Sequence, residues 1–172
     1  MYRKAVPSDA AAIAEIYGRI HDGEEAGRSS IGWIRSVYPT LTTAEKAIKD
    51  GEMYVSEHEG VLCAAGRINQ NQEEVYYEVP WLYPAEDREV LVLHTLVVDP
   101  PYAGQGEGSG FVAFYEAMAR DMGCTVLRMD TNERNEKARR LYKRLGYREA
   151  GIMPCVFNGI PGVGLVCLEK KL

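Results

Sequence analysis

Residues 97–110 read Val97-Val98-Asp99-Pro100-Pro101-Tyr102-Ala103-Gly104-Gln105-Gly106-Glu107-Gly108-Ser109-Gly110. A Val- and Leu-rich run precedes this stretch and a helical apolar pattern follows it, which predicts a strand, a tight turn and the start of a helix. The closely spaced glycines allow successive backbone amides to point into one concavity, and the helix dipole adds partial positive charge there. The pattern indicates a phosphate or pyrophosphate site, with a plain surface turn as the alternative.

Two well-known nucleotide motifs are excluded in this stretch. A P-loop needs a Lys-Ser or Lys-Thr pair after its glycines, and none follows here. In the dinucleotide-binding pattern G-x-G-x-x-G the third glycine would fall on Ser109 or on Phe111, depending on the starting glycine. The turn is therefore expected to bind an anion by another arrangement.

Outward from the turn, the periodicity of apolar residues predicts the remaining elements. In chain order we expect helices over about 8–20, 31–38 and 42–51, a β-hairpin over 53–68, strands over 75–79 and 89–98, a helix over 109–122, a strand over 126–129, a helix over 138–145, and strands over 147–156 and 163–170. This order predicts one domain, residues 1–172, with a mixed α/β layer fold and a parallel step in the middle of its sheet.

Composition narrows the function. The 172 residues carry a formal net charge of −5, which argues against a general nucleic-acid binder. No apolar run is long enough to span a membrane, so no membrane partner is expected. The cysteines and histidines lack metal-ligand spacing, so we expect no metal site, and the cysteines are typical of buried thiols in a reducing cytoplasm.

A second informative stretch covers residues 130–147, which read Asp130-Thr131-Asn132-Glu133-Arg134-Asn135-Glu136-Lys137-Ala138-Arg139-Arg140-Leu141-Tyr142-Lys143-Arg144-Leu145-Gly146-Tyr147. Together the two stretches resemble the GNAT superfamily of acyl-CoA-dependent N-acetyltransferases. That family shows V-x-P-x-x-[RQ]-G-x-G-[IVL]-G before a helix and N-x-x-N-x-x-A-x-x-L-Y-x-x-x-G-[FY] further along. The chain matches at Val98, Pro100, Gly104, Gly106, Gly108, Asn132, Asn135, Ala138, Leu141, Tyr142, Gly146 and Tyr147.

The resemblance implies a central, mostly antiparallel mixed sheet with a splayed parallel pair and helices on both faces. It also implies acetyl-CoA as co-substrate, with the backbone of the central strand pairing with the pantetheine arm. The implied cofactor-binding residues are Leu96, Val97, Val98, Gly104, Gln105, Gly106, Glu107, Gly108, Ser109, Asn135 and Ala138. Asn135 has an alternative role as the cap of its own helix.

Two positions depart from the family pattern. Ala103 replaces the usual Arg or Gln, which removes a side-chain contact to phosphate. Glu107 replaces an aliphatic residue, and its carboxylate would repel a pyrophosphate unless it turns away. A basic run from Arg134 to Arg148 either forms a solvated helix face or helps to attract the anionic coenzyme.

The chemistry of acyl transfer needs a proton donor for the departing sulfur, a base for the amine and donors for the oxyanion. The resemblance assigns the donor to Tyr142, whose alternative role is a core aromatic, and the oxyanion to the amide of Val98. His94 is the candidate base, because it lies four residues before Val98 and hence on the same face of a regular strand. Glu24, Glu25 and Glu78 are the alternative candidates for this base. Its alternative role is a buried histidine bonded to a neighbour.

Acidic and aromatic side chains suit a cationic amine. For the acceptor wall we expect Glu24, Trp33, Tyr38, Glu78 and Trp81, with Glu25 and Tyr77 as further candidates. Glu24 and Glu25 are expected in the loop after the first helix. The predicted function is transfer of an acetyl group from acetyl-CoA to a primary amine of a small molecule or amino acid, by direct attack in a ternary complex. The alternatives are a non-catalytic acyl-CoA-binding or sensor module and a protein or peptide N-acetyltransferase, and a homodimer is one option for assembly.

Overall fold

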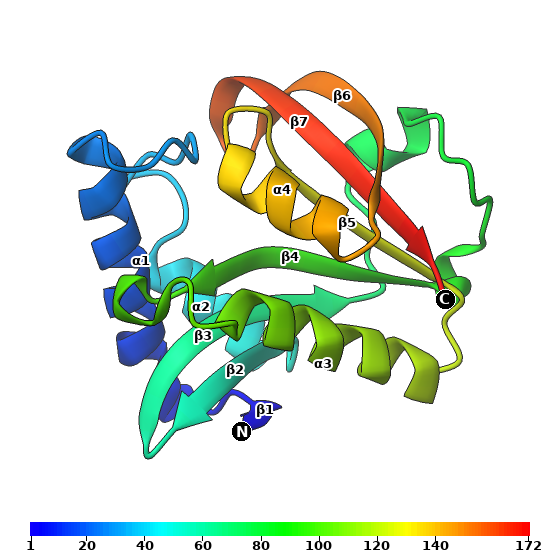
Figure 1. The fold of residues 1–172 in the computed structure, drawn as a ribbon. Coiled ribbons are helices and arrows are strands. Elements are labelled where there is room, and N and C mark those ends of the chain that lie inside the picture. Colours follow the sequence, from blue (N-terminus) through cyan, green and yellow to red (C-terminus); the bar gives the residue numbers. More distant parts are fainter.

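The protein is described over all residues 1–172 by a computed structural model. Its strands form one seven-stranded sheet in the order β1-β2-β3-β4-β5-β7-β6 (Figure 1). The strands are β1 (Tyr2–Lys4), β2 (Met53–His58), β3 (Val61–Asn69), β4 (Val90–Val98), β5 (Val126–Asn132), β6 (Arg148–Phe157) and β7 (Ile160–Lys171). All neighbours are antiparallel except β4 and β5. The mixed sheet with one parallel step is therefore confirmed.

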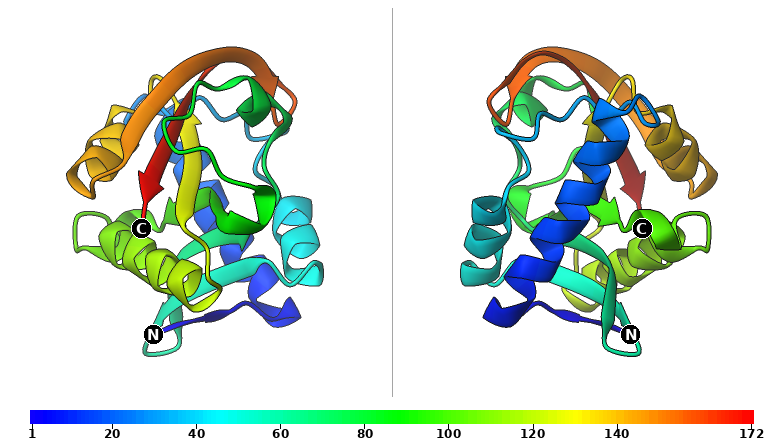
Figure 2. Two further views of the ribbon diagram at one scale, coloured as in Figure 1. Left: turned by 90° about the vertical axis from the view of Figure 1, so that its right-hand side faces the viewer. Right: turned by 90° about the vertical axis from the view of Figure 1, so that its left-hand side faces the viewer.

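Four α-helices cover the sheet: α1 (Ala10–Glu25), α2 (Leu41–Lys49), α3 (Glu107–Asp121) and α4 (Glu136–Arg144). Figure 2 shows α1 and α2 on one face and α3 and α4 on the other, as expected for helices on both faces. The predicted stripe of α1 is buried, since Ile13, Ile16 and Tyr17 are almost fully covered. None of these helices combines the length and the apolar character needed to cross a membrane.

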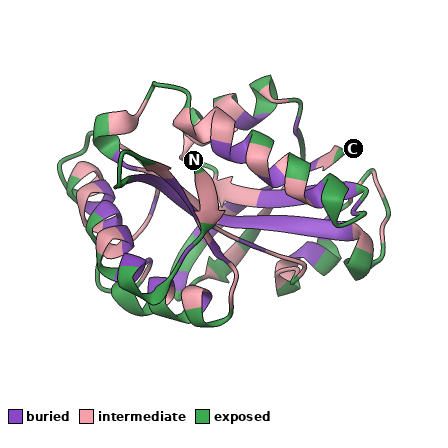
Figure 3. Ribbon diagram, turned by 90° about the horizontal axis from the view of Figure 1, so that it is seen from below, coloured by how far each residue is buried: buried purple, intermediate pink, exposed green.

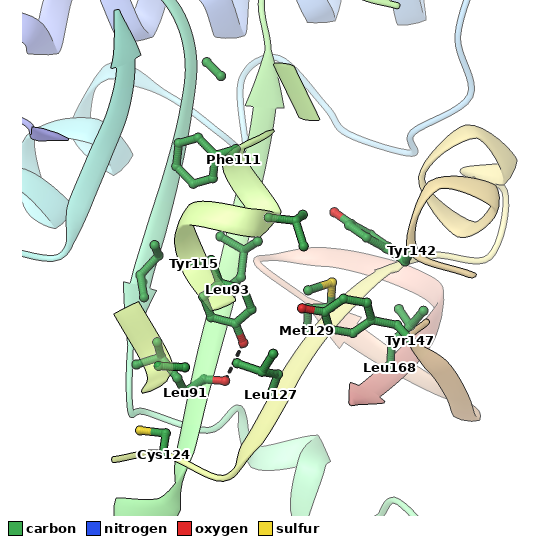
Figure 4. Close-up of a cluster of buried hydrophobic side chains, with 14 of the residues drawn as sticks. Leu91, Leu93, Phe111, Tyr115, Cys124, Leu127, Met129, Tyr142, Tyr147 and Leu168 are labelled. Atoms are coloured by element: carbon green, nitrogen blue, oxygen red, sulfur yellow. Dashed lines mark hydrogen bonds between the residues drawn. The ribbon is translucent and has the colours of Figure 1, made fainter. Parts of the chain in front are cut away.

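The largest core cluster fills the space between the sheet and helices α3 and α4. Burial is concentrated in the central strands, while each helix is buried along one side only (Figure 3). Tyr115 of α3 donates its hydroxyl to the carbonyl of Leu91 on β4 at 2.5 Å (Figure 4). The same hydroxyl lies 3.1 Å from the carbonyl of Arg128 on β5. This contact links α3 to the parallel pair of strands.

Two predicted elements are wrong. Residues 31–38 form a loop with an isolated bridge between Ile34 and Tyr38, because Gly32 takes a left-handed φ of 83° that a helix does not contain. The strand expected over 75–79 is a 3₁₀ helix, Glu74–Glu78, that buries Tyr76. In both cases only part of the apolar pattern packs on the core, such as Ile31 and Tyr76, while Ile34 and Tyr77 are exposed.

The boundaries at the N-terminus also differ from the prediction. α1 continues to Glu25, so Glu24 and Glu25 are helical and do not lie in the loop as expected. The short strand β1 was not predicted; it pairs along β2 at the edge of the sheet, with Arg3 opposite Val55. Three residues are too few for a recognisable alternation of apolar side chains.

The parallel pair separates within the length of its strands. β4 and β5 pair only from Val90 opposite Val126 to Leu93 opposite Met129. Beyond that point β4 follows β3 and β5 follows β7, and the two strands diverge (Figure 1). The resulting gap in the sheet is the splayed geometry that the resemblance implied.

A β-bulge on β4 lies at the start of this gap. His94 is opposite Arg67 on β3 and Val97 is opposite Ala65, so two residues of β4, Thr95 and Leu96, face a single glycine between them. Thr95 takes a φ of 51°, in the left-handed region that a threonine rarely occupies. A bulge of this kind bends the strand and increases its twist, which helps β4 to leave β5.

Candidate functional site

A cleft of about 1350 Å³ opens where β4 and β5 separate. Most of the predicted coenzyme residues line it, which brings together segments far apart in the sequence. These lining residues are Leu96, Val97, Val98, Gly104, Gly106, Gly108, Ser109, Asn135 and Ala138, and the predicted proton donor Tyr142 lines the cleft as well. Gln105 and Glu107 do not line the cleft; the side chain of Gln105 donates to the carbonyl of Pro101.

The glycine turn presents unused hydrogen-bond donors to this cleft. Gly104 and Gly106 have φ values of 81° and 93°, which only glycine adopts without strain. The backbone amides of Gly104, Gly106, Glu107, Gly108 and Ser109 donate to no acceptor in the protein. They surround the N-terminus of α3, where the helix dipole is positive, so the turn can hold an anion.

The carboxylate of Glu107 turns away from the turn. It accepts a hydrogen bond from the Ser56 hydroxyl at 2.9 Å and lies 2.8 Å from Nε2 of His58, both on the β2–β3 hairpin. Its side chain is only 12% exposed. The sequence suggested that Glu107 would repel a bound anion. This repulsion is reduced, because the carboxylate points away from the turn and is bound by Ser56 and His58.

Basic side chains line the other wall of the cleft. Arg28, Arg134, Lys137 and Arg144 all face it, and none forms an ion pair within the protein. Their positive charges are thus available to an anionic ligand, on a chain whose net charge is −5. Three other members of the basic run are already paired, Arg139 with Glu149, Arg140 with Glu136 and Arg148 with Glu169.

The backbone of β4 also points into the gap. The amide of Asp99 donates to the carbonyl of Cys63 on β3 at 2.8 Å. Because successive amides of an extended strand point in opposite directions, the amide of Val98 faces the side that β5 has left. This edge can pair with an extended ligand as a further strand would.

Tyr142 projects from α4 toward the gap between the strands (Figure 4). The residue is buried, yet its hydroxyl has no hydrogen-bond partner in the protein, and the residue lines the cleft. Burial, together with the charge of Asp130, raises the pKa of this phenol above its ordinary value. The hydroxyl therefore stays protonated near neutral pH.

Asn135 caps α4, as one of its two expected roles required. Its side-chain oxygen accepts a hydrogen bond from the amide of Ala138 at 3.2 Å. The residue also lines the cleft, and the NH2 group of its side-chain amide forms no hydrogen bond in the protein, so it can donate to a ligand.

A second, smaller cavity of about 280 Å³ lies on the α2 side of β4. Hydroxyl groups and charged side chains line most of it, including Thr40, Arg67, Glu73 and His94. Five residues line both this cavity and the cleft: Tyr38, Thr95, Asp130, Phe157 and Asn158. The two spaces therefore meet at the point where the strands diverge.

His94 lines the smaller cavity and not the cleft. Its Nε2 lies 2.9 Å from the side-chain oxygen of Asn69, and its Nδ1 lies 3.2 Å from Glu73. The expectation that His94 shares a face with Val98 is wrong, because the bulge shifts the alternation by one residue. His94 instead shares a face with Val97, whose side chain packs in the α1–α2 cluster.

Asp130 is a site residue that the sequence analysis did not single out. Its Oδ2 accepts a hydrogen bond from the Tyr76 hydroxyl at 2.7 Å, and its other oxygen has no protein partner. Burial raises the pKa of this carboxyl to about 6. A polar residue that follows the apolar run of a parallel strand is a recognisable signal for such a position, since ligands bind at this end of the strands.

The expected acceptor wall is only partly assembled. Trp33 lines the cleft and Tyr38 lines both cavities, with the two rings edge to face at 6.0 Å. Glu24 lines neither; its carboxylate accepts from the amides of Ile31 and Gly32 at 2.6 and 2.8 Å and so fixes the following loop. Glu78 and Tyr77 are exposed, Trp81 stacks on Arg128, and Glu25 pairs with Arg35, all away from the cavities.

The chain is similar over part of its length to proteins of known activity. It is 39% identical over 59 residues to the thialysine N-epsilon-acetyltransferase of Sus scrofa, covering 34% of this chain and 35% of that protein. It is 38% identical over 58 residues to the aminoalkylphosphonate N-acetyltransferase of Salmonella typhimurium, covering 34% and 38%. The chain spans about a third of the length of these curated relatives. A longer match, 26% identical over 151 residues, covers 86% of this chain and 89% of the uncharacterized N-acetyltransferase YhfO of Bacillus subtilis.

Solved structures share the whole fold. A GNAT-family acetyltransferase from Streptococcus agalactiae has a TM-score of 0.82 at 22% identity, covering 100% of this chain and 95% of that one. The Salmonella typhimurium protein yncA, solved with its cofactor acetyl-CoA, has a TM-score of 0.71 at 20% identity, covering 100% and 93%.

The strongest comparison is with a family model. The model described as the acetyltransferase (GNAT) family matches residues 17–147. This range is more than half of the chain, and it contains the glycine turn, the splayed strands and α4. The chain therefore belongs to the GNAT family of acetyltransferases.

Proposed function

We propose that this protein is an acetyl-CoA-dependent N-acetyltransferase that acts on a primary amine of a small molecule or amino acid, by direct attack in a ternary complex. The proposal depends on one observation about the cleft. The unpaired backbone amides of the glycine turn line one part of it, and Asp130 lies where it meets the second, polar cavity.

The residues of the cleft fit coenzyme A. The unpaired amides of Gly104 and residues 106–109 suit its pyrophosphate, and the unpaired cations of Arg134, Lys137 and Arg144 suit its further negative charge. The free edge of β4 at Leu96–Val98 suits the amides of the pantetheine arm. When bound, acetyl-CoA supplies the acetyl group as a reactive thioester.

Two groups of this chain are placed to assist the transfer. The amide of Val98 points into the gap and can donate to a carbonyl oxygen that gains negative charge. The hydroxyl of Tyr142 has no competing partner and can give its proton to the departing sulfur. Both donors are fixed in place by the sheet and by α4 before any ligand binds.

The proposed acceptor class rests on chemistry and on relatives. The carboxylate of Asp130 between the two cavities favours a cationic amine, and two similar proteins are named for small amines, thialysine and an aminoalkylphosphonate.

The four cysteines are all free thiols, which supports a reducing, cytoplasmic setting.

A thiol-release assay tests the proposal. Purified protein is mixed with acetyl-CoA and a panel of amino alcohols, diamines, amino acids, aminophosphonates and peptides. We expect thiol release that depends on the amine and yields the N-acetylated product by mass spectrometry. Binding of acetyl-CoA without turnover across the whole panel would contradict an enzyme and favour a sensor, and turnover with peptides alone would favour a protein acetyltransferase.

A further inference from the structure

Asp130 lies at the meeting point of the two cavities. It is the only acidic residue among the five that line both the cleft and the smaller cavity. It follows Met129, the last residue of β5 that pairs with β4, and so stands at the mouth of the gap. A ligand group at this carboxylate would face the coenzyme cleft on one side and the polar cavity on the other.

Asp130 forms no ion pair within the protein. Its Oδ2 is held by the Tyr76 hydroxyl, a neutral donor, while its other oxygen is unpartnered. No lysine, arginine or histidine forms an ion pair with it, although Arg67 and His94 line the same small cavity. A half-buried carboxylate without a cation is suited to receive one from a ligand.

From this placement we propose that Asp130 is a catalytic residue that binds the ammonium group of the acceptor and accepts its proton, and that the 280 Å³ cavity holds the rest of the acceptor. The inference rests on the proposed function. It adds the base, the position of the acceptor and the acceptor's chemical class.

The lining of the small cavity identifies that class. Hydroxyl and amide groups predominate, from Tyr38, Thr40, Thr42, Thr43, Thr95 and Asn158. The three basic residues are already paired with carboxylates, Arg67 with Glu52 at 2.6 Å, Lys46 with Asp50 at 2.7 Å and His94 with Glu73 at 3.2 Å. With no free cation for a carboxylate or phosphonate, the cavity fits a small amino alcohol, whose hydroxyl groups can exchange hydrogen bonds with the wall.

Each proton that moves in the transfer has a donor and an acceptor. The carboxylate of Asp130 takes one proton from the bound ammonium, and the freed nitrogen lone pair forms the C–N bond at the acetyl carbon. The C–S bond breaks and the sulfur keeps its electron pair, which the proton of Tyr142 then neutralises. The second amine proton restores the phenol and Asp130 releases its proton to water. Ammonium and thioester thus give amide, thiol and one proton.

The ionisation of Asp130 supports this role. Its pKa of about 6 leaves it ionised at neutral pH but closer to that of a working base than an ordinary aspartate. The titratable and charged groups that surround it are Glu73, Tyr76, His94, Arg67, Tyr38, Tyr142, Cys155 and Cys167. Below this pKa the carboxyl is neutral and can neither bind the ammonium nor accept its proton, so activity should fall on the acid side.

The primary test compares Asp130→Asn with the wild type in the thiol-release assay, using ethanolamine and 3-aminopropanol as probes. We expect kcat/KM for the amine to fall by roughly 100-fold or more and its acid limb near pH 6 to disappear, while the Kd of acetyl-CoA stays within about twofold. Asp121→Asn, at an exposed position at the end of α3, is the matched control for loss of one carboxylate.

A second variant keeps the test independent of how well Asp130→Asn folds. Tyr76→Phe removes the hydrogen bond that stabilises the ionised carboxylate, so the midpoint of the acid limb should move to higher pH. A purely structural role for Asp130 predicts no such movement. An acid limb that persists in Asp130→Asn and vanishes in His94→Gln would assign the base to His94 and overturn the inference.

The remaining outcomes separate the two proposals. Absence of thiol release by the wild type with every amine would overturn the proposed function and this inference with it. Full activity of Asp130→Asn alongside an active wild type would overturn only the role of Asp130. Faster turnover of glycine or 2-aminoethylphosphonate than of the amino alcohols would overturn the acceptor class.

Discussion

At Tyr142 a buried phenol reaches the wall of the cleft without a hydrogen-bond partner. If it protonates the departing sulfur, Tyr142→Phe removes that proton and leaves the shape of the wall unchanged. We expect kcat to fall about 100-fold with little change in the Kd of acetyl-CoA. Steady-state kinetics and calorimetry measure the two quantities separately.

Tyr147 provides the matched control for that variant. Its ring packs against Tyr142 with centroids 6.1 Å apart, but its hydroxyl donates to Glu116, and neither Tyr147 nor Glu116 lines the cleft. Tyr147→Phe should cost about 1 kcal/mol of stability and leave kcat unchanged. An equal loss of kcat in both variants would show that packing, and not the proton of Tyr142, matters.

The His58–Glu107 contact makes a second prediction at the level of residues. His58→Ala removes one of the two partners that hold the Glu107 carboxylate away from the glycine turn. The freed negative charge should raise the KM for acetyl-CoA about fivefold, close to 1 kcal/mol. Adding Glu107→Gln to His58→Ala should restore the wild-type KM, and a KM that stays high in this double variant would contradict the explanation.

Single residues also show where prediction from sequence ends. The motif positions Gly104, Gly106 and Tyr142 could be assigned in advance, because their roles depend on backbone freedom and on fixed spacing. The use of Glu24 could not, since whether its carboxylate meets a substrate or the amides of Ile31 and Gly32 depends on the path of a loop. Asp130 could not be assigned in advance, because its lack of an ion-pair partner and its place between the two cavities depend on the three-dimensional structure.

At the level of elements, the bulge of β4 governs the geometry of the site. Gly66 lies opposite it, and a Cβ there would lie 2.8 Å from the ring of Phe111 and 3.1 Å from Leu93. Gly66→Ala should therefore destabilise the protein by about 1–3 kcal/mol and lower kcat/KM for acetyl-CoA, as the splay is disturbed. Chemical denaturation and kinetics measure both effects.

Gly18, in the middle of α1, is the control. A Cβ at this position meets nothing within 4 Å, and alanine favours the helix by about 0.5–1 kcal/mol. Gly18→Ala should leave stability unchanged or raised and activity intact. Equal destabilisation by both substitutions would contradict a specific role for the bulge.

Helices and strands with a sustained period were predictable, and short apolar stretches were not. The apolar stripe of α1 keeps the helical period over several turns, so the helix can bury it only by turning that side toward the sheet. Residues 31–38 carry a similar spacing over fewer positions, but the left-handed Gly32 and the packing of Ile31 and Trp33 on the α1 cluster make them a loop. The bulge has no sequence signature, because the packing of neighbouring residues, and not the sequence at Thr95, imposes its positive φ.

At the level of the whole molecule, an acidic chain carries a basic cleft. This separation of charge should attract the anionic coenzyme over a distance and weaken as salt screens it. We expect Lys137→Glu to raise the KM for acetyl-CoA several-fold at low salt, with kcat unchanged and the effect smaller at high salt. Lys49→Glu, on an exposed turn of α2 away from both cavities, changes net charge equally and should leave the KM unaffected. An equal effect of both would point to net charge alone.

The overall fold could be predicted from two short motifs in the right order. The residues of the proposed acceptor side could not. The proposed coenzyme side is built largely from backbone, whose geometry can be predicted from glycines and strand ends. The proposed acceptor side is built from side chains on α1, α2, strands β2 to β6 and the connecting segments, and their convergence depends on the twist and divergence of the sheet.

The most direct measurement of the central claim is a titration of ¹⁵N-labelled protein with coenzyme A, followed by amide chemical shifts. We predict saturable shifts of the amides of Gly104, Gly106, Glu107, Gly108 and Ser109, together with Val98, while amides of α2 do not move. Unchanged resonances of these six amides at millimolar coenzyme A would contradict the account.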